Sequence, residues 1–366
     1  MELACAFNQN FITGDLAIPD DVSLIEIGIE AFNYITKTGF PGSFKNYSGR
    51  YSLHIGRSPI TEADEAQDAF ISEVIPDLRG ASHVKSCGFH LCGPRQTGIG
   101  RYGFTSHYEC TPEQEKQAIQ FVNKIKLKTG KEVWIENANF YSPTGQSLIR
   151  NLDSTMRIAN EAEAGLILDL AHMVIDARNN NLDPRLFAGF VHWQHVVELH
   201  LSGIIKGRDG ALHDGHSKAV DLECWKLFEE LMTIGLVSRD VYINIEHSDD
   251  TWRNSSVEYE MDFKTCLAMM QQEPKTSSYS ENTDAYARSY LKSSLKRSVV
   301  NMGEICDVLE RHEDQLIADW FDYLDKNNLS VAFTLAEIDS VAGRRTQVYT
   351  EAFSQFVEQA CDPDRS

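Results

Sequence analysis

The sequence lacks several features that define common classes of protein. It has no apolar run near 18 residues, so no segment is expected to span a bilayer. Its eight cysteines form no CxxC pair and no dense framework, which favours reduced thiols over a disulfide scaffold. The N-terminal MELACAFNQN lacks the basic stretch and long apolar core of a signal peptide. These absences predict a cytoplasmic protein without a membrane partner.

Basic residues are scarce relative to acidic ones. The chain has 34 Lys and Arg against 54 Asp and Glu, which gives a formal net charge of −20. This balance argues against nucleic acid as a partner, and it leaves room for bound cations. With 366 residues, of which 42% are hydrophobic, the chain is long and apolar enough to bury a sizeable core.

Eight short apolar runs alternate with segments that carry helix signals. The runs cover residues 3–7, 24–28, 52–56, 83–88, 132–137, 165–170, 196–201 and 241–246. The clearest helix begins at Thr111-Pro112 with Gln114 as its capping box and ends at Gly130. Helices are also expected over residues 64–76, 152–163, 221–233 and 255–271. The count predicts an α/β chain with a (β/α)₈ TIM-type barrel, and a doubly wound open sheet is the alternative.

The rest of the chain differs from the alternating part. Residues 274–286, PKTSSYSENTDAY, are polar and typical of a linker. Residues 287–366 show helical spacing and no motif that assigns them a function. We therefore expect a metal-binding catalytic barrel over residues 1–273, a linker, and an appended helical module.

Histidines and acids gather where the predicted strands end, which is where active sites of such barrels lie. They are His54, His90, Glu136 with Asn137, Asp169 with His172, His200, Glu246, and Asp214 with His216 on the loop after the seventh strand. Carboxylates crowded into one barrel mouth repel each other, and bound cations remove that cost. Imidazole together with carboxylate suits iron, zinc or manganese. The candidate ligands exceed what one ion needs, so two or three ions are expected.

The same residues carry a resemblance to a known family. The ordered set is LHIG (53–56), GFH (88–90), IEN (135–137), LDLAH (168–172), ELHLSG (198–203), D-G-H (214–216) and IEHSD (245–249). Over residues 1–273 the chain resembles the multinuclear non-haem iron-dependent oxidases. That family includes the iron enzyme of methanobactin biosynthesis and the enzyme that excises a cysteine carbon in thiaglutamate biosynthesis.

The resemblance implies a ligand set and a chemistry. Positions that match the family's iron ligands are His54, His90, Glu136, Asp169, His200, Asp214, His216 and Glu246, and Asn137 matches a further ligand or hydrogen-bond donor. It also implies two or three irons in mixed Fe(II)/Fe(III) states, with O₂ as co-substrate. The substrate would be a ribosomally made precursor peptide modified at cysteine, often with a leader-binding partner protein.

Two positions depart from the family pattern. The family usually has Asn where this chain has His172, and an acid where it has Ser248, followed by Asp249. These departures place the third metal position in question: it is altered, absent or ligated by another group.

Basic side chains near the predicted mouth are candidates for holding a substrate anion. Arg57 follows His54, while Arg95, Arg101 and His107 lie in the long loop after the fourth strand. The same loop contains G-x-G-x-x-G at residues 98–103, but no strand leads directly into it and no helix opens from it. A dinucleotide site needs both, so a loop at the mouth is the better interpretation.

Two other functions compete with the oxidase. A barrel hydrolase or isomerase of the xylose isomerase or endonuclease IV type uses similar residues with zinc, manganese or magnesium. A non-catalytic metal-binding or scaffold protein is the third alternative, with the C-terminal extension as its working part. The ELHLSG and D-G-H motifs favour the oxidase.

Overall fold

A closed barrel of parallel strands forms the centre of the chain. The structure is a computed structural model, and it describes residues 1–94, 108–137, 145–180, 183–188, 191–207, 210–233 and 235–271. The barrel strands are β1 (Glu2–Ala6), β2 (Val22–Ile27), β3 (Arg50–Ile55), β4 (Val84–His90), β5 (Glu132–Glu136), β6 (Gly165–Asp169), β7 (Val196–Leu201) and β10 (Tyr242–Ile245). Their order around the barrel is β1-β10-β7-β6-β5-β4-β3-β2. The predicted (β/α)₈ barrel is confirmed, and each predicted apolar run overlaps one strand.

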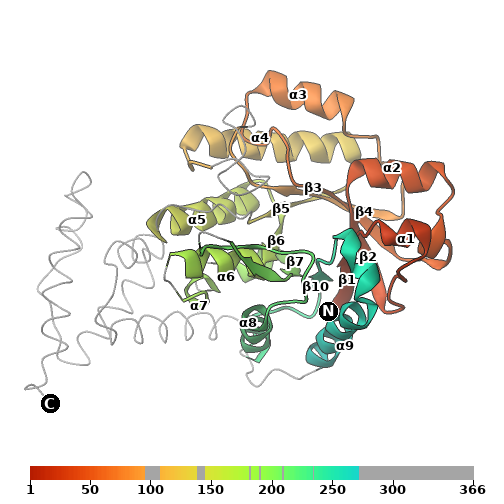
Figure 1. The fold of residues 1–366 in the computed structure, drawn as a ribbon. Helices are drawn as coiled ribbons and strands as arrows, with labels where there is room; N and C mark the ends of the chain where they lie inside the picture. The colour runs from red at the N-terminus through yellow and green to blue at the C-terminus, as the bar shows by residue number, and fades with distance from the viewer. Residues whose placement is uncertain are drawn as a thin grey trace, which may run out of the picture.

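Helices lie around the outside of these strands (Figure 1). The α-helices are α1 (Asn10–Thr13), α2 (Ile29–Lys37), α3 (Asp64–Glu73), α4 (Pro112–Thr129), α5 (Gly145–Glu161), α6 (Leu170–Asn179), α7 (Arg185–Ala188), α8 (Leu222–Thr233) and α9 (Ser256–Met270). Short 3-10 turns are η1 (Gly42–Asn46), η3 (Trp193–His195) and η4 (Asp250–Asn254). The capping box that opens α4 is formed by Thr111 and Gln114, and Gly130 ends the helix in the left-handed conformation.

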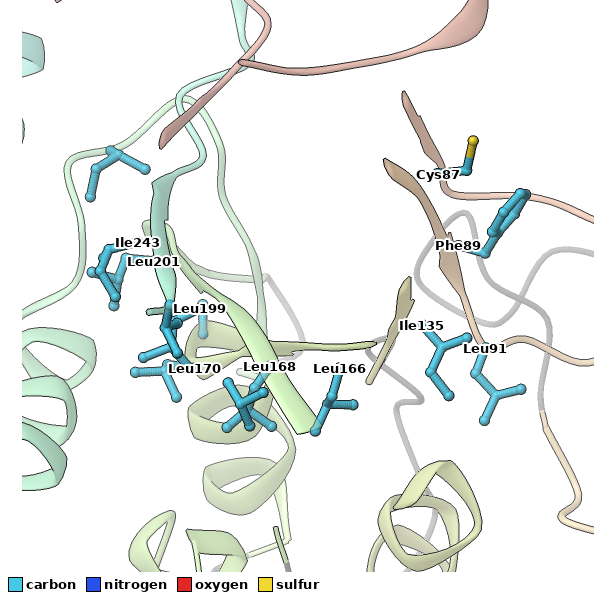
Figure 2. Close-up of a cluster of buried hydrophobic side chains, with 14 of the residues drawn as sticks. Cys87, Phe89, Leu91, Ile135, Leu166, Leu168, Leu170, Leu199, Leu201 and Ile243 are labelled. Carbon is cyan, nitrogen blue, oxygen red and sulfur yellow. The ribbon is translucent and has the colours of Figure 1, made fainter. Parts of the chain in front are cut away.

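Alternation along the strands divides their side chains between two environments. One set points outward and packs under the helices; Figure 2 shows Cys87 and Phe89 of β4, Ile135 of β5 and Leu199 of β7 among them. Successive side chains of a strand point to opposite faces, so the other set points into the barrel. This second set carries His90, Glu136 and His200, which places the chemistry inside.

The interior of the barrel changes in character along its axis. The amino-terminal end is apolar and holds Ala4, Leu24, Trp134, Ile167 and Tyr242 as one buried cluster. The carboxyl end holds the histidines and acids. The apolar cluster thus lies toward the end of the barrel away from these histidines and acids.

Two features of the fold were not anticipated from the sequence. Helices α2 and α6 follow their strands almost without a loop, and α6 begins immediately after Asp169, whose side chain accepts from the backbone N–H of His172. A two-stranded hairpin, β8 (Ile204–Lys206) with β9 (Leu212–Asp214), extends the loop after β7. It carries Asp214 back over the barrel mouth.

Several predictions fall outside the described residues. The linker 274–286, the extension 287–366, Arg95, Arg101 and His107 all lie there, and they stay predictions. Among the described residues, none of the helices has the length and apolar character needed to cross a membrane.

Candidate metal centre

Side chains from six strands converge at the carboxyl mouth of the barrel. The strand register brings them together in neighbouring pairs, His90 opposite Glu136 and Asp169 opposite His200. They are nearly withdrawn from solvent: Glu136 is 1% exposed, and Asp169 and His200 are 0% exposed. Each sits at or near the last residue of its strand, so the closed barrel alone determines the convergence.

The first cluster consists of His54, His90 and Glu136. The Oε2 atom of Glu136 lies 3.2 Å from Nε2 of His54 and 3.1 Å from Nε2 of His90. Gly88 pairs with His54 in the strand register, and a Cβ atom there would come within 3.1 Å of the His54 ring. The glycine of the GFH motif therefore makes room for the imidazole. One ion at the meeting point would find two nitrogens and one oxygen.

A second cluster adjoins the first through the other oxygen of Glu136. Nδ1 of His200 lies 3.3 Å from Oε1 of Glu246, 3.8 Å from Oδ2 of Asp169 and 3.9 Å from Oε1 of Glu136. The ligand atoms of Asp169, His200 and Glu246 lie within 4.8 Å of one another. Glu136 thus faces both clusters, one carboxylate oxygen to each, as a ligand that bridges two metals does.

A third group lies beyond Glu246. Nε2 of His216 is 2.6 Å from Oδ2 of Asp214 and 3.7 Å from Oε2 of Glu246. His172 stands between this group and the second, with Nε2 3.5 Å from Oδ2 of Asp214 and 3.6 Å from Oδ2 of Asp169. The position that departs from the family pattern is therefore occupied by an imidazole among carboxylates.

Unsatisfied polar atoms test whether the residues fit metals. Buried polar atoms nearly always have hydrogen-bond partners. Within the described part of the chain, Glu136 Oε2, Asp169 Oδ2, His200 Nδ1 and His216 Nε2 are buried and make no hydrogen bond. These are the atoms that face the cluster centres. Nitrogen and carboxylate donors aimed at common points fit iron, zinc or manganese.

The charges of the cluster act strongly on one another. Burial raises the pKa of Asp169 well above its usual value; the cation of His172 opposes this, and the carboxylates of Glu246 and Asp214 add to it. The pKa of Glu246 is well below its usual value, because His200 and His216 outweigh the effect of burial. Opposed shifts in one site are typical of crowded groups that need a counter-charge.

The imidazoles predict how the stability of the metal-free protein depends on pH. Nearby carboxylates outweigh burial and raise the pKa of His54 to about 9 and that of His216 to about 10, against an ordinary value of 6.5. A raised histidine pKa stabilises the fold below pH 6.5, and this stabilisation is lost as pH rises through 9 and 10. We expect the thermal midpoint of the chelated protein to fall over this range.

The metal-loaded protein is the control for this measurement. A ligating imidazole is already neutral, so we expect a flatter dependence between pH 7 and 10. Calorimetric scans of both forms check the difference, and identical slopes would contradict the assigned contacts.

The remaining predicted residues occupy distinct places. Asn137 is bound to the backbone of Asp169: its Oδ1 accepts from the N–H at 2.7 Å and its Nδ2 donates to the carbonyl at 3.2 Å. Ser248 lies 2.8 Å from Nδ1 of His216 through its hydroxyl, so it orients this ring toward Asp214. Arg57 is exposed after β3. The ligand role of Asn137 and the substrate role of Arg57 stay predictions.

Two acidic residues of the site were missed from the sequence. Glu26 of β2 and Glu198 of β7 are buried inside the barrel, and with His200 they form a further group with ligand atoms within 4.8 Å. Both lie in the middle of apolar runs, and the candidate residues were sought at the ends of the runs, so neither glutamate was predicted. The available signal was Glu198 standing two residues before His200, a spacing that places both on one face of a strand.

Fold and site together define a (β/α)₈ barrel with adjoining candidate metal positions at its carboxyl mouth. In a comparison with known families, residues 83–262 match the model of RiPP precursor modification enzymes MbnB/TglH/ChrH. Over these residues, just under half of the chain, the protein is similar to that family. The match covers the segment from β4 to α9, with most of the candidate ligands.

Individual relatives are distant. A UPF0276 protein of Anaeromyxobacter sp. (strain Fw109-5) is 25% identical over 180 residues, which are 49% of this chain and 62% of the relative. The chain therefore spans less than two thirds of that protein. A UPF0276 protein of Shewanella sediminis is 22% identical over 228 residues, which are 59% of this chain and 77% of the relative.

Two of the solved structures with some similarity are sugar epimerases. D-psicose 3-epimerase from Clostridium cellulolyticum H10 aligns with a TM-score of 0.41 and 11% identity over 80% of this chain and 98% of its own. The 3-keto-D-glucoside 4-epimerase YcjR from E. coli aligns with a TM-score of 0.39 and 15% identity, over 72% of this chain and 99% of its own.

Proposed function

We propose that this chain is an iron- and O₂-dependent oxidase that modifies a ribosomally made precursor peptide at cysteine. The observation that carries the proposal is the position of Glu136, which faces two adjoining clusters of histidine and carboxylate with one oxygen each. Similarity to the MbnB/TglH/ChrH family over residues 83–262 supports the peptide substrate. The formal net charge of −20 argues against the endonuclease alternative.

The residues divide into groups with separate tasks. His54 and His90 with Glu136 would hold one iron, and Asp169, His200 and Glu246 would hold a second. Asp214 and His216, with Glu246, offer a third position. Bound iron would supply Lewis acidity that favours the thiolate of a substrate cysteine and a means of using dioxygen.

The protein's own contribution is position and exclusion of water. His54 and His90 are the ligands with some exposure, at 14% and 19% of their side chains, whereas the second cluster is nearly sealed. A peptide therefore reaches the first cluster from the mouth, and the thiolate would bind on the His54 side of Glu136. The ligands of the second cluster, Asp169, His200 and Glu246, would keep the second iron away from solvent.

Peptide turnover tests the proposal. The full chain, purified without air and loaded with ferrous iron, is mixed with candidate precursor peptides encoded beside its gene, with and without O₂ and a leader-binding partner. We expect an O₂-dependent mass change at a cysteine-containing segment, located by tandem mass spectrometry. A cysteine-to-serine peptide is the control. Turnover of a sugar or phosphate ester with zinc or manganese, and no peptide change with iron, would favour the hydrolase or isomerase.

A further inference from the structure

Glu26 of β2 points into the barrel, where it lies beneath the first and second clusters. It is 4% exposed. Its Oε2 accepts a hydrogen bond from Nε2 of His200 at 3.0 Å, and its Oε1 lies 3.0 Å from Nδ1 of His54. Each oxygen of one carboxylate thus faces a different imidazole, and the two imidazoles belong to different candidate metal positions.

The contact with His200 crosses the barrel. Strand β2, which carries Glu26, adjoins β3, but β1 and β10 separate it from β7. Ala6 of β1 pairs with Glu26 in the register, and Ala4 and Ala6 present small side chains on that strand. The space they leave allows the glutamate to reach the far wall.

The two contacts determine which nitrogen of each ring faces the metal positions. A histidine that donates one N–H to a carboxylate presents its other nitrogen as a ligand, and such partners fix the ring and raise its basicity. With Nδ1 of His54 held, Nε2 lies 3.2 Å from Glu136 Oε2. With Nε2 of His200 held, Nδ1 lies 3.3 Å from Glu246 Oε1. The rings use opposite nitrogens because they approach the same glutamate from opposite walls.

We propose that Glu26 is a shared positioning residue, which holds His54 and His200 in opposite tautomers so that each presents a nitrogen to a different metal position. The inference rests on the proposed function only in requiring that the clusters bind metal. It makes the occupancy of the two positions depend on one carboxylate that lies behind a histidine of each position.

Glu198 provides a matched comparison inside the same barrel. It is also an acid of the interior, 0% exposed, with Oε1 3.7 Å from Nε2 of His200. This contact is longer than the 3.0 Å at which Glu26 reaches each of its two rings, and it involves one ring only. Its replacement by glutamine removes a carboxylate from the same region but affects only one ring, so it separates the effect of charge from the positioning of both rings.

The test is titration of the anaerobic full-length protein with Co²⁺, followed by the visible absorption bands of bound cobalt. Glu26→Gln keeps the size of the side chain but offers an oxygen to only one ring. We expect its apparent affinity for cobalt to fall by about 10–100-fold, as is typical when an outer partner of a ligating histidine is lost. The band positions should also change, because they report the nitrogen ligands. Glu198→Gln, which affects one ring only, should weaken cobalt binding clearly less than Glu26→Gln, and circular dichroism confirms the fold of each variant.

The outcomes separate this inference from the proposed function. Unchanged cobalt binding by Glu26→Gln, or equal weakening by Glu198→Gln, would overturn the positioning role. If Glu26→Gln does not fold, Glu26→Asp replaces it: the shorter acid cannot span both rings, so it too should bind cobalt more weakly. Wild-type protein that binds cobalt in the expected way but never modifies a peptide would contradict the proposed oxidase and leave the role of Glu26 intact. Wild-type protein that binds no cobalt would overturn both.

Discussion

Replacement of Glu136 by alanine is expected to lower peptide modification by more than about 100-fold, since even outer-shell partners of metal ligands contribute about 10–100-fold. The physical reason is that Glu136 faces two clusters, with Oε2 toward His54 and His90 and Oε1 toward His172 and His200. Its loss removes a donor from both positions at once. Metal analysis of the purified variant and turnover of the peptide measure the effect.

The control lies on the same strand. Glu132 begins β5 at the opposite end of the barrel, is half exposed, and contacts Lys85. Glu132→Ala should keep wild-type metal content and activity. Full metal content in Glu136→Ala would show that the bridging geometry has been assigned to the wrong residue.

Loading with iron is expected to raise the thermal midpoint of the protein by about 5–10 °C. The metal-free mouth holds Asp169, Asp214, Glu136 and Glu246 close together, and a bound cation relieves their repulsion. A ligand at 100 times its Kd adds about 2.7 kcal/mol to the free energy of unfolding. For a domain of this size each kcal/mol corresponds to about 2–4 °C.

Differential scanning calorimetry of chelated and reloaded protein measures the shift. Asp64 of α3 provides the comparison, because it contacts Lys124 of α4 on the surface and lies in none of the candidate metal clusters. Asp64→Ala should show the same rise in thermal midpoint on loading as the wild type. A midpoint that does not change on loading, at iron concentrations far above those of the protein, would contradict a buried multinuclear site.

The barrel could be predicted from the sequence because its strands are apolar and short. Most strand side chains that pack under a helix are Val, Ile, Leu or aromatic, so each strand is visible in the sequence as an apolar run. The hairpin of β8 and β9 was not predictable in this way. Its strands have three residues each with half-buried or exposed side chains, so no apolar alternation marks them.

The same physics explains what could be predicted of the site. His90, Glu136 and Asp169 end their strands, and the ends of parallel strands meet at one mouth. Glu26 lies inside a run of Leu and Ile, and its importance depends on the reach of its side chain across the barrel to His200. Such a contact joins residues 174 positions apart, and no local pattern encodes it.

Metal content of the anaerobically purified full-length chain is the most direct test of a multinuclear iron centre at this mouth. Inductively coupled plasma mass spectrometry gives the count, and Mössbauer spectra of protein loaded with ⁵⁷Fe give the oxidation states and the coupling between ions. We expect two or three irons per chain, at least two of them magnetically coupled. One iron or none, or stoichiometric zinc or manganese that ferrous iron does not replace, would contradict it.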